Sequence, residues 1–191
     1  MSELVPDAEA TAAPPRARAW PVVLVGLMGA GKTVVGRRLA RVLGVSFCDA
    51  DEEIAAAAGM GIPDIFEVYG EAAFRDLERR VIARLMRDPP GVLALGGGAF
   101  VDPEVRRLVK EGAVSIWLRA DLETLLRRTE RRRHARPLLA REDPRRVLRR
   151  LMEERYPLYA EADLVVDTGE QPVEVVVTRI RDLLADRADR S

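Results

Sequence analysis

The chain has 191 residues, of which 48% are hydrophobic and 32% are charged, so it is long enough to bury one full core without disulfides or metals. Its 31 basic and 31 acidic residues cancel, so no bulk charge favours nucleic acid or an acidic membrane as a partner. The single cysteine, Cys48, excludes an internal disulfide framework and suits a reducing cytoplasm, and the chain shows neither a secretory signal pattern nor an apolar run of membrane-spanning length.

Strands and helices are predicted to alternate along most of the chain. The first residues are rich in Ala, Glu and Pro without apolar periodicity, so we expect a disordered tail over 1–19, one domain over 20–187 and a short tail over 188–191. Apolar runs predict five strands, at residues 21–25, 45–48, 91–95, 113–118 and 164–166. Helical spacing and caps predict helices at residues 33–43, 54–58, about 63–69, 71–87, 103–110, from 121, 142–156 and 172–185. This alternation predicts an α/β fold, with a parallel five-stranded sheet covered by helices on both faces.

Residues 26–33 carry the strongest motif of the chain. They read Gly26-Leu27-Met28-Gly29-Ala30-Gly31-Lys32-Thr33 and match G-x-x-x-x-G-K-[ST] between a predicted strand and a predicted helix. Lys32, one of only two lysines in the chain, would reach the β- and γ-phosphates of a nucleotide, and the Thr33 hydroxyl would ligate Mg²⁺. The alternative is a glycine-rich turn that binds nothing. Because the motif is complete and correctly flanked, we predict that this phosphate loop binds a nucleoside triphosphate.

Two aspartates follow the second predicted strand. The carboxyl ends of strands in an α/β sheet are where ligands bind, and alternate residues at a strand end can point in different directions. Asp49, nearer the strand, is therefore the candidate for the metal side, through water. Asp51 is the candidate for accepting a proton from a substrate hydroxyl. The alternative is that residues 51–53 only cap a helix and are stabilised by its dipole.

A triple glycine and three arginines complete the candidate residues. Residues 96–98, at the end of the third predicted strand, are all glycine, which suggests a ligand packed against the backbone, although an ordinary flexible turn is the alternative. Arg75, Arg136 and Arg155 each lie beside an apolar residue or a proline, and guanidinium groups suit carboxylates and phosphates. Taken singly, each arginine is more often a surface charge than a ligand.

Together these motifs resemble the shikimate kinase family. The resemblance runs from about residue 22 to the final helix and covers the phosphate loop, the aspartate pair, Phe74-Arg75, the triple glycine, Arg136-Pro137-Leu138-Leu139 and Arg155-x-Pro-Leu-Tyr. As a set these motifs are very specific. The resemblance implies a three-layer α/β/α P-loop kinase fold with a five-stranded parallel sheet and a mobile lid at about residues 129–142. It also implies ATP-dependent phosphorylation of the 3-hydroxyl of shikimate, in the pathway to chorismate and the aromatic amino acids, by a cytoplasmic monomer that uses Mg²⁺.

The resemblance implies a role for each matching residue. The implied catalytic residues are Lys32, Asp51 and Arg136. The implied ATP-binding residues are Gly29, Ala30, Gly31, Lys32, Thr33, Val34, Arg128 and Arg136. The implied shikimate-binding residues are Asp51, Arg75, Gly96, Gly97, Gly98 and Arg155, with the two arginines on the carboxylate. The implied metal ligands are Thr33 and Asp49.

The chain also departs from the family pattern in places, and rival functions can be stated. It is one residue longer than the common spacing between Arg128-Thr129 and Arg136-Pro137, and the segment 169–172 lacks a basic residue that some members have there.

A gluconate-type kinase of the same fold is the nearest rival, and the triple glycine, Asp-x-Asp and Arg-Pro-Leu-Leu argue against it. A non-catalytic nucleotide switch and an RNA-binding protein that uses the arginines of residues 127–150 are rivals from other classes. That basic patch contains no aromatic residue for base stacking and is diluted by acids, so we expect neither nucleic acid nor membrane as a partner.

Overall fold

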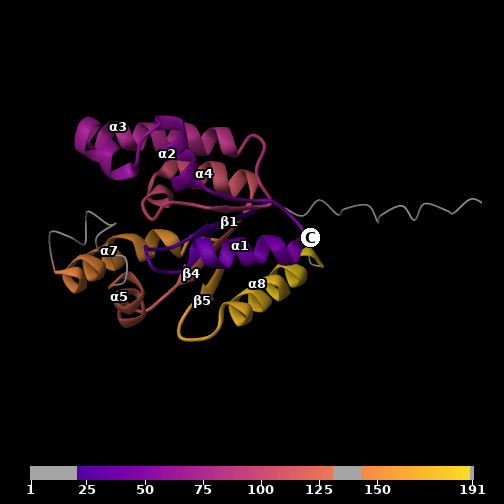
Figure 1. Ribbon diagram of the computed structural model, residues 1–191. Coiled ribbons are helices and arrows are strands. Elements are labelled where there is room, and N and C mark those ends of the chain that lie inside the picture. The colour runs from indigo at the N-terminus through magenta and orange to yellow at the C-terminus, as the bar shows by residue number, and fades with distance from the viewer. Residues whose placement is uncertain (1–20, 131–142, 190–191) are drawn as a thin grey trace, which may run out of the picture.

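Five parallel strands form one sheet in the computed structural model, which describes residues 21–130 and 143–189 (Figure 1). The strands are β1 (Val22–Val25), β2 (Phe47–Asp49), β3 (Val92–Ala94), β4 (Val114–Arg119) and β5 (Leu164–Asp167). Their order across the sheet is β2-β3-β1-β4-β5. At the centre, Leu24 of β1 is in register with Ala94 on one side and with Ile116 on the other. The loop that follows β1 therefore leaves the sheet between the ends of β3 and β4.

Helices cover both faces of this sheet, which explains why its central strands are apolar throughout. α1 (Lys32–Leu43) and α8 (Val173–Ala188) pack against each other on one face, and α4 (Pro103–Gly112) lies on the other (Figure 1). α5 (Leu122–Glu130) packs against α7 (Pro144–Tyr159), which also contacts the short 3₁₀ helix η1 (Ala99–Val101). All four residues of β1 are buried. The prediction of an α/β fold with helices on both faces of a five-stranded parallel sheet is confirmed.

A second, smaller core lies beside the edge strand β2. It forms between α2 (Ala50–Ala58) and α3 (Ile62–Leu85), and its buried residues are Ile54, Ile65, Phe74 and Val81. Leu85, near the end of α3, packs against both this core and the main one. The pair α2–α3 is thus a helical unit with a hydrophobic core of its own, and it stands at one edge of the sheet (Figure 1).

Several boundaries differ from those predicted. β2 begins at Phe47 rather than at residue 45, and α2 begins directly after it at Ala50 rather than near residue 54. The cause is Asp49, whose carboxylate accepts a hydrogen bond from the backbone N–H of Asp51 at 3.1 Å and so starts the helix at once. The alternative that assigned the cap to residues 51–53 is therefore wrong about which residue caps. α7 also continues through Pro157 to Tyr159, where a bend or stop was predicted.

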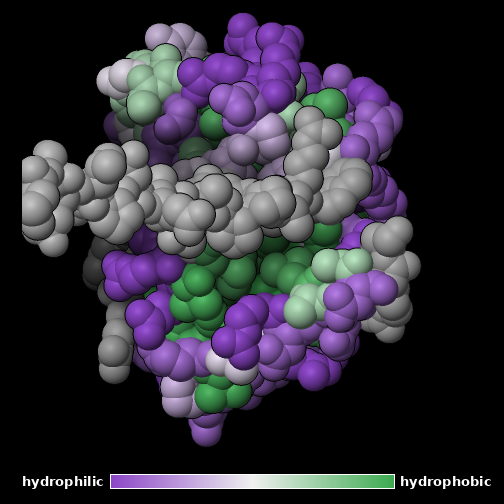
Figure 2. All heavy atoms as spheres, turned by 90° about the vertical axis from the view of Figure 1, so that its right-hand side faces the viewer, coloured by the Kyte–Doolittle hydropathy of each residue, from purple (hydrophilic) through white to green (hydrophobic). Residues whose placement is uncertain are grey.

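The face opposite the carboxyl ends of the strands carries an apolar area. Figure 2 views the right-hand side of Figure 1, where the strands begin, and apolar residues gather there below the grey atoms. Val42 and Leu43, at the end of α1, are exposed apolar residues. Within the described residues, no helix combines the length and the apolar character needed to cross a bilayer.

Gly70 interrupts α3 at the position where the sequence predicts a break between two helices. Its backbone has φ 78° and ψ 173°, a region that residues with a Cβ rarely adopt, and a Cβ added there would meet no atom within 4 Å. The constraint is therefore one of backbone conformation and not of space.

We expect Gly70→Ala to lower the free energy of unfolding by about 1–3 kcal/mol, measured by urea denaturation, because alanine must adopt this strained conformation. Gly70→Asn should not relieve the loss. Gly44→Asn is the matched control, since Gly44 has φ 65° and ψ 32°, a left-handed conformation that asparagine tolerates, with equally open space. Equal losses for Gly70→Asn and Gly44→Asn would contradict this account.

Candidate active site

The phosphate loop lies between the end of β1 and the start of α1, as predicted. Gly26, Gly29 and Gly31 all have positive φ, at 145°, 86° and 99°. A Cβ on Gly26 would lie 2.7 Å from the carbonyl oxygen of Leu118, so close packing as well as backbone conformation requires glycine there. No side chain caps α1 at Gly31, and no acidic residue occupies its first turn. The N-terminus of α1 therefore keeps its N–H groups and its positive potential for an anion.

Lys32 and Thr33, the two candidate functional side chains of the loop, lie where α1 begins. The Lys32 ammonium donates hydrogen bonds to the carbonyl oxygens of Gly26 and Leu27, at 2.8 and 3.2 Å, so it lies folded across the loop. Val34, a residue of the predicted ATP set, is 57% exposed in the first turn of α1, whereas Ala30 is buried. The loop thus places a cation beside the N-terminus of α1.

Thr33 and Asp49 are brought together, as predicted for a metal site. The Thr33 hydroxyl donates to one carboxylate oxygen of Asp49 at 2.7 Å, and the other oxygen accepts from the N–H of Asp51. Hydroxyl and carboxylate oxygens are ligands that Mg²⁺ prefers, and this ion keeps several waters and needs only one or two protein groups. Residues 21–130 and 143–189 contain no cluster of three or more His, Cys, Asp or Glu side chains that could hold a metal by themselves. The residues present fit a Mg²⁺ ion held jointly with phosphates.

The triple glycine lies against two of the predicted substrate residues. A Cβ on Gly96 would lie 2.5 Å from a carboxylate oxygen of Asp51, and a Cβ on Gly98 would lie 2.6 Å from a guanidinium nitrogen of Arg75. The glycines were predicted to admit a ligand to the backbone. In the structure they also admit the side chains that would hold such a ligand, so an ordinary flexible turn is not the explanation.

Asp51 is exposed as a residue, yet its carboxylate lies against Gly96, where protein atoms displace much of the water. This desolvation raises the pKa of Asp51 above that of an ordinary aspartate. The nearby Lys32 and Arg75 cations oppose the rise, and Asp49 adds to it. Asp51 is therefore a stronger base than a free aspartate, at the point where the phosphate loop and the triple glycine meet.

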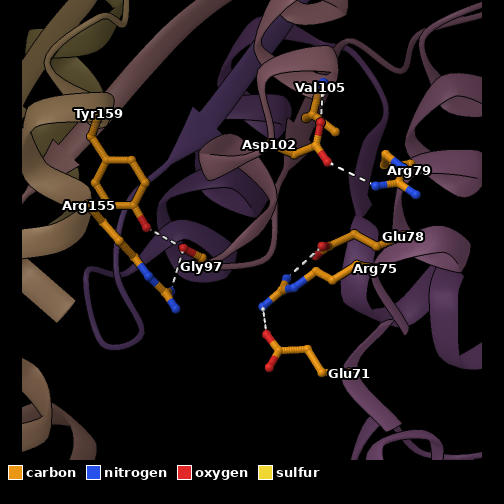
Figure 3. Close-up of polar contacts among 9 residues, drawn as sticks. All are labelled: Glu71, Arg75, Glu78, Arg79, Gly97, Asp102, Val105, Arg155 and Tyr159. Atoms are coloured by element: carbon orange, nitrogen blue, oxygen red, sulfur yellow. Dashed lines mark hydrogen bonds and ion pairs between the residues drawn. The ribbon is translucent and has the colours of Figure 1, made fainter. Parts of the chain in front are cut away.

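Arg75 is held by an acid that sequence reasoning missed. Its guanidinium donates to the carboxylate of Glu78 at 2.7 Å and to that of Glu71 at 3.4 Å (Figure 3). Glu78 is only 3% exposed, and burial raises its pKa while Arg75 lowers it. Burial lowers the pKa of Arg75, but the hydrogen bonds that Arg75 donates to Glu78 and Glu71, together with the charges of these two carboxylates, outweigh that effect, and the pKa rises. A signal existed, because Glu78 lies on the buried stripe of α3, four residues after Phe74 and three before Val81.

Arg155 reaches the triple glycine from the other side. It lies on α7 and donates to the carbonyl oxygen of Gly97 at 2.8 Å, beside the hydroxyl of Tyr159, which donates to the same oxygen (Figure 3). A Cβ on Gly97 would lie 3.6 Å from both the Arg155 guanidinium and the Met28 amide nitrogen. Gly97 therefore lies between Arg155 and the phosphate loop, next to the two glycines that contact Asp51 and Arg75.

Arg128 connects the phosphate loop to the segment after β5. Its guanidinium donates to the carbonyl oxygens of Gly29 and Ala30, each at 3.4 Å, and to that of Gly169. Burial, together with the neighbouring Arg127, lowers the pKa of Arg128. Thr168, which the sequence analysis also missed, is buried, and its hydroxyl donates to the carbonyl oxygen of Ala30 at 3.1 Å. Arg136 and residues 131–142 of the predicted lid lie outside the described residues.

Comparisons with known proteins agree with this arrangement. A family model described as shikimate kinase matches residues 28–185. The chain is 56% identical over 168 residues to a shikimate kinase of Paramagnetospirillum magneticum, covering 88% of this chain and 86% of the relative. It is 58% identical over 168 residues to a shikimate kinase of Caulobacter vibrioides, covering 86% and 84%.

A solved structure agrees as well. The shikimate kinase of Acinetobacter baumannii, in complex with shikimate, superposes with a TM-score of 0.85 at 39% identity, over 89% of this chain and 95% of that one. The matched region contains the phosphate loop from Met28 onward, the aspartate pair, the triple glycine and Arg155. This chain belongs to the shikimate kinase family.

Proposed function

We propose that this chain transfers the γ-phosphoryl group of ATP to the 3-hydroxyl of shikimate and forms 3-phosphoshikimate. The observation that carries the proposal is the convergence of Asp51 and Arg75 on the triple glycine, one backbone away from the phosphate loop. An acceptor with a carboxylate at one end and hydroxyls at the other matches a recess with guanidinium groups and a basic carboxylate. Phosphoryl transfer depends mostly on such positioning and on neutralisation of charge.

The acceptor side is built from residues with distinct tasks. Arg75 and Arg155 bind the carboxylate of shikimate, and Glu78 keeps the Arg75 guanidinium oriented through the 2.7 Å hydrogen bond. Asp51 orients the reacting hydroxyl and accepts its proton, and the raised pKa suits it to that task. The backbone of the triple glycine lines the same recess. The roles of Asp51, Arg75, Arg155 and the triple glycine follow the family pattern at the matching positions. The role of Glu78 rests on its contact with Arg75.

The nucleotide side is proposed for the phosphate loop and the lid. The amides of Gly29, Ala30, Gly31, Lys32, Thr33 and Val34 bind the phosphates, and Arg128 borders the adenine. Lys32 leaves the loop carbonyls to reach the β- and γ-phosphates. Arg136, in a lid proposed for about residues 129–142, neutralises charge on the transferring group, and closing the lid excludes water as a competing acceptor.

Mg²⁺ is proposed as the cofactor, with Thr33 and Asp49 as its protein ligands, Asp49 through water. When bound, the ion neutralises phosphate charge and orients the β- and γ-phosphates. We further propose one catalytic domain over residues 20–187 that acts as a cytoplasmic monomer on small molecules, without nucleic acid or membrane as a partner. The balanced charge of the chain supports the absence of nucleic acid and membrane partners from this proposal.

The acceptor is tested with purified protein, ATP and Mg²⁺ in an assay coupled to ADP release. We expect turnover with shikimate, and none with gluconate, without an acceptor or after removal of metal by a chelator. ADP release that does not depend on shikimate would contradict the proposal and indicate a simple ATPase. Turnover with gluconate would favour the gluconate-type rival, and retention of RNA on filters at physiological salt would favour the nucleic-acid rival.

The two arginines are tested by shikimate binding, measured calorimetrically. Arg75→Ala and Arg155→Ala should each weaken binding by about 2–3 kcal/mol, the scale of a charged hydrogen bond left unpaired, with little change in ATP affinity. Arg80→Ala is a matched control on α3, because Arg80 is 70% exposed and pairs with Asp76 at the surface. Arg75→Ala also leaves Glu78 buried without its partner, so it alone should lower the unfolding midpoint clearly. Normal shikimate binding by both variants, with loss of ATP binding, would refute the assignment.

The two aspartates are tested by their response to Mg²⁺. Asp51→Asn should lower kcat by about 10²–10⁴-fold, the usual contribution of a general base, and keep ATP binding. Asp49→Asn should raise the Mg²⁺ concentration for half-maximal rate, and excess metal should restore part of the activity. Because asparagine caps helices as well as aspartate does, Asp49→Asn should leave folding stability nearly unchanged.

The two variants should differ in their response to Mg²⁺: excess metal should rescue Asp49→Asn but not Asp51→Asn. Rescue of Asp51→Asn by Mg²⁺, without rescue of Asp49→Asn, would mean that the two roles are reversed. Full activity in both variants would leave the pair with a structural role only, at the start of α2.

A further inference from the structure

The carbonyl oxygen of Gly97 accepts hydrogen bonds from two side chains of one helix. Arg155 donates at 2.8 Å and the Tyr159 hydroxyl donates to the same oxygen (Figure 3). The two residues are four positions apart on α7, so they lie on the same face one turn from each other. The proposed function uses Arg155 and Gly97 but gives Tyr159 no role, although it ends the Arg155-x-Pro-Leu-Tyr motif.

The two donors differ in how firmly they are held. Tyr159 is 1% exposed, and its ring packs against Phe100, Trp117 and Tyr156 with centroid distances of 6.5, 6.0 and 6.2 Å. Burial raises the pKa of Tyr159 to about 12 against the opposing charge of Arg155, so the hydroxyl keeps its proton and remains a donor. Arg155 is only partly buried and has a long flexible side chain. The tyrosine is the fixed donor and the arginine is the movable one.

The position of Gly97 matters to both halves of the site. A Cβ on Gly97 would lie 3.6 Å from the amide nitrogen of Met28 and 3.7 Å from the carbonyl oxygen of Gly26, so this residue sets the spacing between the acceptor recess and the phosphate loop. If Arg155 turned toward a carboxylate and were the sole donor, the Gly97 carbonyl would be left without a partner. An unpaired acceptor of this kind would penalise substrate binding.

We propose that Tyr159 is a positioning residue for the acceptor site: its hydroxyl holds the Gly97 carbonyl in place and thereby releases Arg155 for the carboxylate of the substrate. This inference rests on the proposed function for the role of Arg155. The hold on Gly97 itself can be examined without any substrate.

Tyr159→Phe in the full chain removes the hydroxyl and keeps the ring. We expect the KM and the Kd for shikimate to rise about 3- to 10-fold, the worth of one neutral hydrogen bond, with a smaller change in kcat and no change in the KM for ATP. Tyr156→Phe is the matched control, because Tyr156 lies on the same helix, packs against Trp117 at 4.8 Å and donates its hydroxyl to another backbone carbonyl, that of Ala120. It should leave the KM for shikimate within about twofold of the original value.

Amide hydrogen exchange of the ligand-free protein gives a second readout. Tyr159→Phe should speed exchange in residues 96–101, where Ala99 and Val101 donate to the carbonyls of Gly96 and Gly98, and Tyr156→Phe should not. Equal losses of shikimate affinity in both variants, or a lower unfolding midpoint with unchanged affinity and exchange, would overturn the proposal. If the unmodified chain does not bind shikimate, the proposed function fails, and exchange alone then decides whether Tyr159 holds Gly97.

Discussion

The contact between the buried Glu78 and the partly buried Arg75 determines which groups lie against the triple glycine. A carboxylate that is 3% exposed needs a partner, and Arg75 supplies a hydrogen bond of 2.7 Å from the same helix. This contact directs the rest of the guanidinium toward Gly98, where only a residue without a side chain leaves room. Asp51 makes the same demand on Gly96. The triple glycine is thus a consequence of charged groups that must lie close to the backbone of the β3 end.

Most of the proposed nucleotide side of the site could be predicted from the sequence, because its residues are contiguous or follow strand ends. The phosphate loop is one unbroken motif, and Asp49 meets Thr33 since parallel strands bring their carboxyl ends to one edge of the sheet. The five strands followed from apolar runs, and the α/β class followed from their alternation with helices. The start of α2 could not be placed, because one carboxylate both ends β2 and caps the helix, which leaves no linker residues to mark a boundary.

The missed residues share a physical cause. Glu78, Tyr159 and Thr168 are polar residues at buried positions. Tyr159 and Thr168 donate to backbone carbonyls far away in sequence, whereas Glu78 pairs with a cation three residues earlier on its own helix. An acid on an apolar helical stripe is a detectable anomaly, but the stripe does not reveal which cation it meets. A tyrosine at helical spacing reads as core, and its hydroxyl bond to Gly97, 62 residues earlier, becomes visible only in three dimensions.

The second core between α2 and α3 has a consequence for engineering. Asp51, Arg75 and Glu78 all come from residues 50–85. These residues enclose the second core and join the main core through Ala50, Ile82 and Leu85. The phosphate loop comes from another part of the chain. In the proposed function the stretch 50–85 supplies Asp51 and Arg75, whereas the triple glycine and Arg155 lie elsewhere. A new acceptor would therefore be sought by exchanging residues 50–85 together with residues 96–98 and 155, while the phosphate loop is kept.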